Sequence, residues 1–380
     1  MTCRVMLMVS SMRGGGSERQ TLLLLQKIDR HKLTPHLYLL ERDGDLLDQV
    51  PKDVPIHSFD EVSRGSELYF PGRKLRQQTN HVGKVIDQQA IDVVYDRTFH
   101  MTMLAGSACK GRGIPRVSTI VSPPDHALPL VESRFVGLKR RRLATAYHQS
   151  RSVVAVSQQA ADSAEHYYGL PKGRVQVIPN PIDIEATREQ ATLSQVSRDQ
   201  RLTIVCVGRM TIEKGHNDLI RGLHLCEQNW PEHLPAIRIW LVGDGPLRDD
   251  LQALWQQHSR GIHTIDFLGA QNAASYIDSA DALLLPSLFE GMPNVVLEAM
   301  ALETPVIATR AGGTIELERD EPTIQWIDPG NPNSIATSIR EFALDRHSAN
   351  QRVNAASRLV QQAHDAGNIT HEIEALLLQA

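Results

Sequence analysis

The sequence has few cysteines, no long apolar run and no excess of either charge. The longest apolar segments fall short of the ~18 residues that a transmembrane helix needs, which argues against a membrane span. The apolar run near the N-terminus, residues 5–9, is also shorter than the apolar core of a signal peptide, which needs at least ~7 residues, so we expect a cytoplasmic protein. Only four cysteines are present, without C-x-x-C spacing, so we expect reduced structural thiols rather than a disulfide scaffold: Cys3, Cys109, Cys206 and Cys226.

Charge and length set two further limits. Lys plus Arg (40) against Asp plus Glu (44) gives a formal charge of −4, which offers no global attraction for nucleic acid. Any contact with a polyanion must therefore be local. The 380 residues exceed the roughly 250 to 300 at which single cores stop growing, so the chain is expected to form two domains.

Short apolar runs alternate with turn residues and helical patterns along the whole chain, which predicts α/β domains with parallel sheets. The pattern restarts with LTIVCVGRM after a polar segment. We therefore predict a first domain over residues 1–181, a linker over 182–200 and a second domain over 201–355. Residues 356–380 form a helical segment, with packing on the first domain as one option.

The stretch LFEGMPNVVLEAM carries two carboxylates, Glu290 and Glu298, in apolar surroundings. Proline suits a first helical turn, so a helix is expected to begin at Met292 or Pro293, with Asn294 and Glu298 on one face. Both acids could be ordinary surface charges. Alternatively, they accept hydrogen bonds from a polyhydroxyl ligand, because carboxylates match a diol well.

Two cations follow the first strand of the second half, in VGRMTIEKGHNDLI. Arg209 comes directly after the strand and Lys214 follows five residues later. Solvated surface residues are one interpretation. The other is a phosphate site, which Arg grips bidentately and Lys approaches as a mobile charge.

The first strand is followed by a glycine-rich loop, SSMRGGGSERQ. Its glycines allow close backbone approach, and Ser17 with Gln20 resembles a capping box that starts a helix. Arg19 occupies the place of the third glycine of a dinucleotide fingerprint, and no Gly-Lys-Ser/Thr of a P-loop follows.

Together these loops resemble the retaining glycosyltransferases of family four, which have the GT-B fold. The resemblance covers nearly the whole chain and is carried by SQQAADSAEHYYG…VIPNPID, VGRMTIEKG, LVGDGPLRDDL and FEGMPNVVLEAMALETPVIATRAGG. It implies two Rossmann-like parallel-sheet domains that face a deep cleft. The second domain would hold the nucleotide-sugar donor, and the first would bind the acceptor.

The resemblance also implies roles for particular residues. Glu290 would bind donor-sugar hydroxyls and Glu298 the ribose diol, while Arg209 and Lys214 would hold the leaving diphosphate. The implied catalytic residues are Arg209, Lys214 and Glu290. The implied donor-binding residues are Gly15, Gly16, Gly291, Met292, Pro293, Asn294 and Glu298. No cofactor and no metal are expected, because the cations offset the phosphates. Asp43-Gly44-Asp45 matches a metal-binding D-x-D pattern but lies in a turn sequence after a strand of the first domain.

One position departs from the family pattern. Many relatives carry a histidine after the strand that corresponds to RVSTIVSPPD, whereas this chain has Val121-Ser122-Pro123. His100 and His126 are nearby in sequence, either as replacements or as ordinary loop histidines.

A basic run precedes a helical pattern in GLKRRRLATAYHQSR. Its four successive cations are Lys139, Arg140, Arg141 and Arg142. They form either a solvated face or a contact with anionic lipid, which would place the protein at the inner face of the plasma membrane.

The expected function is a retaining hexosyl transfer from a nucleotide-diphosphate sugar, with UDP as the first choice, to a glycan or lipid-linked acceptor in cell-surface polysaccharide or glycolipid synthesis. Two alternatives stay open: a nucleotide-sugar epimerase of the same architecture, and a non-catalytic carbohydrate-binding relative.

Overall fold

The strands of the first sheet form where apolar residues occupy both faces of an extended segment. In the computed structural model, which describes residues 2–60, 72–131 and 134–380, Val5 and Leu7 of the first strand lie in one apolar core. Met6 and Met8 of the same strand lie in a second core on the opposite face. Successive side chains alternate across a strand, so an uninterrupted apolar run requires helices on both faces of the sheet.

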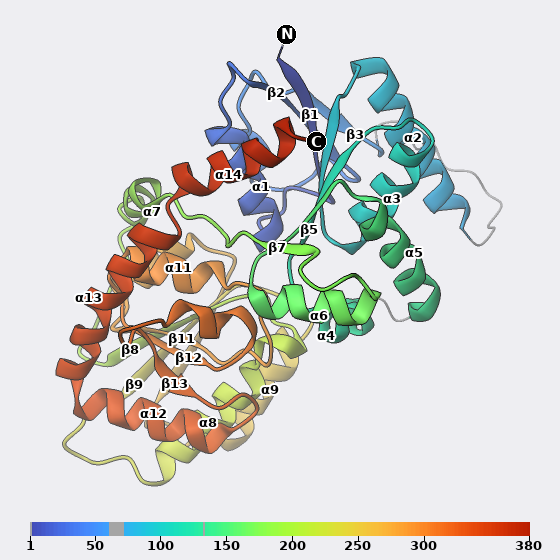
Figure 1. The fold of residues 1–380 in the computed structure, drawn as a ribbon. Coiled ribbons are helices and arrows are strands. Elements are labelled where there is room, and N and C mark those ends of the chain that lie inside the picture. The colour runs from blue at the N-terminus through green and yellow to red at the C-terminus, as the bar shows by residue number, and fades with distance from the viewer. Residues whose placement is uncertain (1, 61–71, 132–133) are drawn as a thin grey trace. The chain divides into compact units, whose positions relative to one another are not determined.

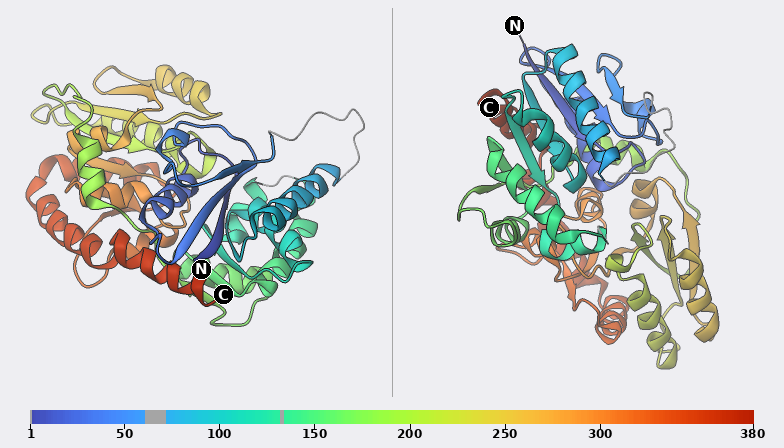
Figure 2. Two further views of the ribbon diagram at one scale, coloured as in Figure 1. Left: turned by 90° about the horizontal axis from the view of Figure 1, so that it is seen from above. Right: turned by 90° about the vertical axis from the view of Figure 1, so that its right-hand side faces the viewer.

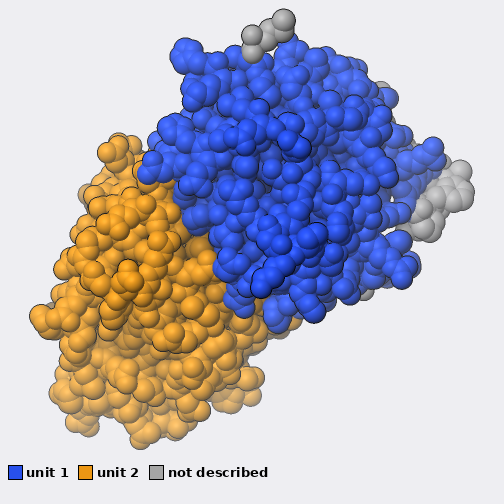
Figure 3. All heavy atoms as spheres, viewed as in Figure 1, with its two compact units in different colours: residues 1–181, 366–380 blue, residues 182–365 orange. Residues whose placement is uncertain are grey.

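The chain divides into two compact units (Figure 3). Unit 1 comprises residues 1–181 and 366–380, and unit 2 comprises residues 182–365. The chain therefore leaves unit 1 once and returns to it at the end. The four cysteines are free thiols, and three of them are buried.

Unit 1 contains a seven-stranded parallel sheet with the order β3-β2-β1-β4-β5-β6-β7 (Figure 1). Its strands are β1 (Cys3–Val9), β2 (Leu33–Leu39), β3 (Ile56–Ser58), β4 (Val93–Arg97), β5 (Arg116–Ile120), β6 (Ser152–Ala155) and β7 (Val175–Val177). The register pairs Leu7 with Leu37 and Leu7 with Tyr95. The order reverses between β1 and β4, which is the Rossmann arrangement.

Helices cover both faces of this sheet. They are α1 (Gly16–Lys27), α2 (Arg73–Gln89), α3 (Phe99–Lys110), α4 (Pro124–Val131), α5 (Val136–Gln149), α6 (Gln158–Tyr168) and α14 (Ala366–Leu378), and a 3-10 turn spans Leu47–Gln49. Side chains of α1 and α14 share one core with β1, whereas side chains of α2 and α3 share the other. The last helix, α14, lies beside α1, the first (Figures 1 and 2).

Unit 2 contains a six-stranded parallel sheet with the order β10-β9-β8-β11-β12-β13. Its strands are β8 (Leu202–Val207), β9 (Ile237–Val242), β10 (Thr264–Gly269), β11 (Ala282–Leu285), β12 (Val306–Thr309) and β13 (Gln325–Ile327). Its helices are α7 (Ile184–Ala191), α8 (His216–Gln228), α9 (Arg248–His258), α10 (Ala273–Ser279), α11 (Asn294–Ala301), α12 (Pro332–Leu344) and α13 (Arg346–Ala363), with 3-10 turns η2 (Ile212–Lys214) and η3 (Gly312–Leu317). This sheet also reverses its order at its first strand, between β8 and β11.

The prediction of two Rossmann-like parallel sheets is thus confirmed. Some segments differ in detail from the sequence-based boundaries. Residues 182–200 contain helix α7 and belong to unit 2 rather than forming a bare linker. Helix α13 runs through residue 356, and only the segment from Ala366 belongs to unit 1.

Candidate functional site

The strand order of unit 2 reverses between β8 and β11, and this reversal is where ligands bind in open parallel sheets. Both strands end in loops at the same edge of the sheet. The loop after β8 leads into η2 and then α8, and the loop after β11 leads into α11. Predicted site residues lie on both loops, so their geometry decides whether they form one site.

Gly215 brings the two loops into contact. Its φ angle is +66°, and a Cβ atom there would lie 2.0 Å from the carbonyl oxygen of Pro286. The backbone N–H of Leu288 also donates to the carbonyl oxygen of Glu213, at 2.8 Å. Only glycine permits both the left-handed backbone and this approach, so the loop after β8 is fixed against the end of β11.

Lys214 and Glu290 form an ion pair at this junction. The Lys214 Nζ to Glu290 Oε1 distance is 2.7 Å, and the Ser287 hydroxyl donates to the same oxygen at 2.7 Å. The Lys214 side chain is 26% exposed and that of Glu290 10%. Burial lowers the pKa of Lys214, but the charge of Glu290 and the hydrogen bond to it outweigh burial, so the pKa is raised above its usual value. The ammonium group therefore stays charged at neutral pH.

A third loop, after β12, fixes the backbone at Glu290. Gly312 has φ +60°, and a Cβ atom there would lie 1.7 Å from the Glu290 carbonyl oxygen. The backbone N–H of Gly313 donates to that oxygen at 3.3 Å. The Thr309 hydroxyl donates to the Ser287 carbonyl oxygen at 2.5 Å. Glu290 thus lies on a loop that contacts the loops after both neighbouring strands, β8 and β12.

The other residues predicted on this loop follow Glu290 directly. Gly291, Met292 and Pro293 are buried, and α11 begins at Asn294 with Pro293 as its N-cap residue. The predicted helix start at Met292 or Pro293 is wrong by one or two residues, because Pro293 has an extended rather than a helical ψ of 106°. Asn294 and Glu298 are both half-buried and lie four residues apart on α11, so they share a face.

Arg209 is exposed, directly after β8. Its side chain forms no salt bridge or hydrogen bond among the residues that the structure describes, whereas Lys214 on the same loop is held by Glu290. The structure therefore brings Lys214 and Glu290 together and leaves the Arg209 guanidinium in solvent.

The predicted glycine loop lies in unit 1, at the end of β1. Helix α1 begins at Gly16 with Gly15 as its N-cap residue, and no side chain caps it. The capping-box prediction is wrong, because Ser17 lies inside the helix and Gln20 donates from Nε2 to the Pro181 carbonyl oxygen at 3.0 Å. Gly15 and Gly16 therefore belong to a different unit from the Lys214–Glu290 pair.

The two histidine candidates also lie in unit 1. His100 is in the first turn of α3, and its Nε2 lies 3.0 Å from Gln78 Oε1. His126 is exposed on α4, and its backbone N–H donates to the side chain of Asp125.

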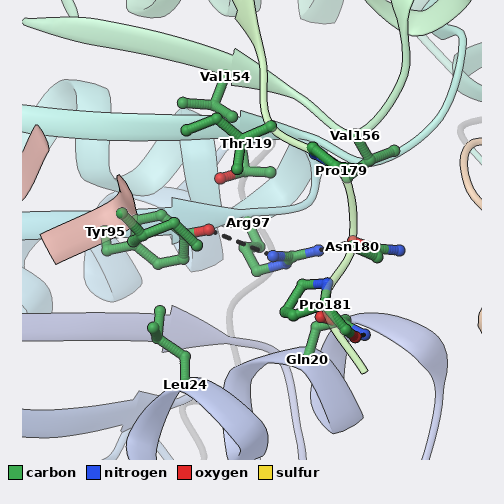
Figure 4. A pocket seen from close by; sticks show the side chains of 12 residues that line it. Gln20, Leu24, Tyr95, Arg97, Thr119, Val154, Val156, Pro179, Asn180 and Pro181 are labelled. Carbon is green, nitrogen blue, oxygen red and sulfur yellow. Dashed lines mark hydrogen bonds between the residues drawn. The ribbon is translucent and has the colours of Figure 1, made fainter. Parts of the chain in front are cut away.

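Sequence reasoning missed Arg97, which ends β4 at the strand reversal of unit 1. Arg97 is 5% exposed, and its guanidinium donates to the Tyr95 hydroxyl at 3.2 Å and to Asn180 Oδ1 at 3.4 Å (Figure 4). No salt bridge to it occurs among the described residues, and it lines a cavity of about 10 Å³, room for roughly one water. A basic residue that ends the apolar run DVVYDR was the available signal.

The remaining predictions concern metal binding and membrane-spanning helices. Asp43 of the D-x-D pattern accepts a hydrogen bond from Arg13 Nε at 2.6 Å, in a turn beside the glycine loop. Across the described ranges, no three or more His, Cys, Asp or Glu side chains are grouped as metal ligands. In those same ranges no helix combines the length and the apolarity that crossing a bilayer requires.

Two family models match the chain over most of its length. The model for Glycosyltransferase Family 4 matches residues 14–186, and that for Glycosyl transferases group 1 matches residues 201–345. The chain belongs to the family-four glycosyltransferases. The family-four match falls on unit 1, and the group 1 match on the strands and loops of unit 2 that carry the Lys214–Glu290 pair.

Two curated glycosyltransferases resemble parts of the chain. An uncharacterized glycosyltransferase of Methanocaldococcus jannaschii is 31% identical over 239 residues, which are 59% of this chain and 59% of that protein. A putative teichuronic acid biosynthesis glycosyltransferase of Bacillus subtilis is 27% identical over 282 residues, 70% of this chain and 66% of that protein. The matches thus span less than two thirds of these relatives' own lengths.

Solved structures share the whole fold. The structure of HepE from Anabaena with UDP-glucose superposes with a TM-score of 0.78 at 21% identity, over 99% of this chain and all of that one. Sucrose-phosphate synthase from Thermosynechococcus elongatus gives a TM-score of 0.80 at 16% identity, over 99% of this chain and 98% of that one. The fold of this family-four chain is therefore the GT-B fold.

Proposed function

We propose that this protein is a retaining, metal-independent glycosyltransferase that moves a sugar from a UDP-sugar to a hydroxyl of a glycan or lipid-linked acceptor. The observation that carries the proposal is the Lys214–Glu290 ion pair, 2.7 Å long, at the point where the strand order of unit 2 reverses. A charged ammonium and a carboxylate at this edge match the two ends of a sugar diphosphate.

The chemistry explains why a cation is needed there. Breaking the sugar–phosphate bond builds negative charge on the departing diphosphate and positive charge at the anomeric carbon. Lys214 has three N–H donors and uses one on Glu290 Oε1, so two are available for phosphate oxygens. Arg209, exposed five residues earlier, is long enough to add a second cation.

The acidic residues and the start of α11 would bind the rest of the donor. Lys214 and Ser287 both bond to Oε1 of Glu290, so we assign Oε2 to a hydroxyl of the donor sugar. Glu298 would accept from the ribose diol, one helical turn from Asn294. Backbone amides of residues 291–294, at the start of α11, would face phosphate.

Similar proteins support the donor and acceptor classes. HepE from Anabaena has been solved with UDP and with UDP-glucose. Relatives named for lipopolysaccharide core biosynthesis and teichuronic acid biosynthesis support a cell-surface glycan or glycolipid as the acceptor. We propose attack by the acceptor hydroxyl on the face that the diphosphate leaves, with a phosphate oxygen taking the proton. We propose no metal and no cofactor, because two cations already offset the diphosphate charge.

A screen of UDP-, GDP- and ADP-sugars by thermal shift tests the donor assignment. A ligand that binds only the folded protein stabilises it by about 2.7 kcal/mol at 100 times its dissociation constant. The cognate donor is then incubated with acceptor extracts, and the anomeric configuration of the product is determined by NMR. An inverted product would contradict the retaining mechanism, and donor conversion without acceptor would favour an epimerase.

We also propose a peripheral membrane contact near the run Lys139–Arg142. Four large apolar side chains at the end of α4 and the start of α5 are exposed by half or more: Leu130, Val131, Phe135 and Leu138. Exposed apolar residues next to basic ones favour the surface of an anionic bilayer. Arg140 is less available, because its Nε donates to the Tyr167 carbonyl oxygen and its guanidinium lies 4.4 Å from the Tyr167 ring centroid.

Vesicle flotation tests this contact. The protein should float with vesicles that contain anionic phosphatidylglycerol and less with neutral vesicles, and Phe135→Ser/Leu138→Ser should reduce flotation. Equal flotation of wild type and double variant would remove the proposal.

A further inference from the structure

Three helices of unit 1 enclose a groove of about 850 Å³ on its surface. Helix α3 packs against both α2 and α5 and lies between them (Figure 1). Helices α3 and α5 approach each other closely at Gly106, where a Cβ atom would lie 2.7 Å from the Ala146 methyl carbon. Because Gly106 and Ala146 are small, they do not fill the groove at this crossing.

Among the described residues, the lining of the groove includes five cations and no acidic residue. Its basic lining residues are Arg73 and Arg76 of α2, Lys110 of α3, and Arg141 and Arg142 of α5. Helices α2, α3 and α5 together carry nine Lys or Arg and one acid, Asp87. Asp87 is already held by Arg112 through bonds of 2.8 and 2.9 Å.

The groove is strongly positive although the whole chain has a formal charge of −4. Within the part of the chain that the structure describes, Arg76, Lys110, Arg141 and Arg142 form no salt bridge. Like charges gathered around a hollow repel one another, and a bound polyanion would remove that repulsion. The electrostatics therefore point to a ligand with several negative charges.

The rest of the lining narrows the ligand class. Hydroxyl and amide groups stand between the cations, from Thr79, Ser107, Thr145 and Gln149. No aromatic residue is among the lining residues that the structure describes, whereas single-stranded nucleic acid is generally bound by aromatic stacking. A hollow with cations on facing walls fits a single chain lying between them better than it fits the flat surface of a bilayer.

We propose that this groove, lined by Arg73, Arg76, Lys110, Arg141 and Arg142, binds an extended anionic glycan, a sugar chain that carries carboxylate or phosphate groups. The cations would pair with the acidic groups, and the neutral side chains would bond to sugar hydroxyls. The proposal concerns binding alone, so it does not depend on the transfer reaction or on the Lys214–Glu290 pair.

Binding of fluorescent oligogalacturonate tests the proposal, with neutral dextran as the uncharged probe and Arg76→Gln/Arg141→Gln as the groove variant. Lys74→Gln/Lys84→Gln is the matched control, because it removes the same charge from exposed positions of α2 outside the groove. We expect the groove variant to bind on the order of 10-fold more weakly at 0.1 M salt, with a smaller salt dependence, and the control to bind within about twofold of wild type. Thermal shift with the UDP-sugar should be the same for all three proteins.

Several results would overturn the proposal. Equal weakening by the control pair would show diffuse attraction rather than a groove. Equal binding of dextran would exclude a role for charge. Binding of anionic vesicles or single-stranded RNA through Arg76 and Arg141, without binding of oligogalacturonate, would assign the groove to another class of ligand. A lost UDP-sugar shift in wild type would bear on the transferase proposal and leave this one standing.

Discussion

At the scale of single residues, the Lys214–Glu290 pair provides a charged ammonium group and holds it in a fixed position. The 2.7 Å contact and the hydrogen bond from Ser287 hold both side chains in position before a ligand arrives. Groups that are already oriented do not have to reorganise when charge develops, which is the main advantage of an enzyme site over water. A partly buried ion pair adds little to the free energy of unfolding, because the cost of desolvating both charges offsets their attraction. We therefore expect this pair to matter more for ligand binding than for stability.

We expect Lys214→Ala to lower turnover by on the order of 10² to 10³, the usual loss when one preorganised charge-stabilising group is removed. Steady-state kinetics at saturating donor measure this effect. Arg221→Ala, which removes an exposed cation from α8, is the control and should leave turnover unchanged. Near-wild-type turnover of Lys214→Ala would refute the role of the lysine.

Glu290→Gln should lower turnover roughly 10- to 100-fold while UDP affinity stays near that of wild type, the scale of one hydrogen bond to a charged group. The amide oxygen can still accept from Lys214 and Ser287, so the loop should keep its conformation. Calorimetric titration with UDP, beside the kinetics, separates the two effects. Equal losses in both would show that Glu290 contacts the nucleotide instead of the sugar.

Two buried histidines should make stability depend on pH. Burial lowers the pKa of His216 to about 4, with the charge of Lys214 as a second cause, and burial also lowers the pKa of His263 to about 4. The unfolded chain binds more protons than the folded chain between pH 4 and about 6.5, so stability falls as the pH falls through this window. Each histidine contributes about 1.4 kcal/mol per pH unit there.

Urea unfolding at several values between pH 4.5 and 7 checks this dependence. His216→Gln should reduce the slope by the contribution of one histidine. An unchanged slope in His216→Gln would mean that folding does not lower the pKa of His216.

At the scale of elements, the site depends on three loops that follow adjacent parallel strands. Strands β8, β11 and β12 are neighbours in the sheet, so their loops emerge at one edge. Two glycines with positive φ then allow backbone contacts that any side chain would block, at Gly215 and at Gly312. The sheet places the loops, and the glycines set their spacing.

Gly312→Ala should therefore do more harm than an ordinary glycine substitution. Its Cβ atom would collide with the Glu290 carbonyl at 1.7 Å, in addition to the ~1 to 2 kcal/mol cost of a left-handed residue. Gly330→Ala is the matched control, because its φ is +69° and the nearest atom, of Leu288, lies 3.8 Å away. Urea unfolding and turnover should both be lower for Gly312→Ala than for Gly330→Ala, and equal effects would contradict a collision at Glu290.

At the scale of the whole molecule, the end of the chain completes the unit that the beginning starts. Ile369, Ile373 and Leu377 of α14 lie in the same core as Val5 and Leu7 of β1. Glu374 accepts a hydrogen bond from the backbone N–H of Asp29 at 2.6 Å. Unit 1 is therefore incomplete until the last 15 residues have been made.

Leu377→Ala should destabilise unit 1 by about 2 to 5 kcal/mol, the range for a buried leucine. Leu378→Ala, one residue further along and 47% exposed, should change stability by less than about 1 kcal/mol. Hydrogen exchange followed by mass spectrometry should show faster exchange in α1 and β1 of the Leu377 variant and little change in unit 2. Equal effects across both units would mean that they unfold together.

The two parallel-sheet domains could be predicted from local sequence patterns, because apolar strand runs and amphipathic helices alternate at short range. The sequence also predicts that Lys214 and Glu290 lie on loops after strands, since each follows an apolar run within the next few residues. The contact between these two side chains, 76 residues apart, could not be predicted in this way, because the strand order and the contact of Gly215 with Pro286 depend on long-range packing. Packing likewise decided the burial of Arg97 and the division of the basic run, in which Arg140 packs on Tyr167 while Arg141 and Arg142 line the groove.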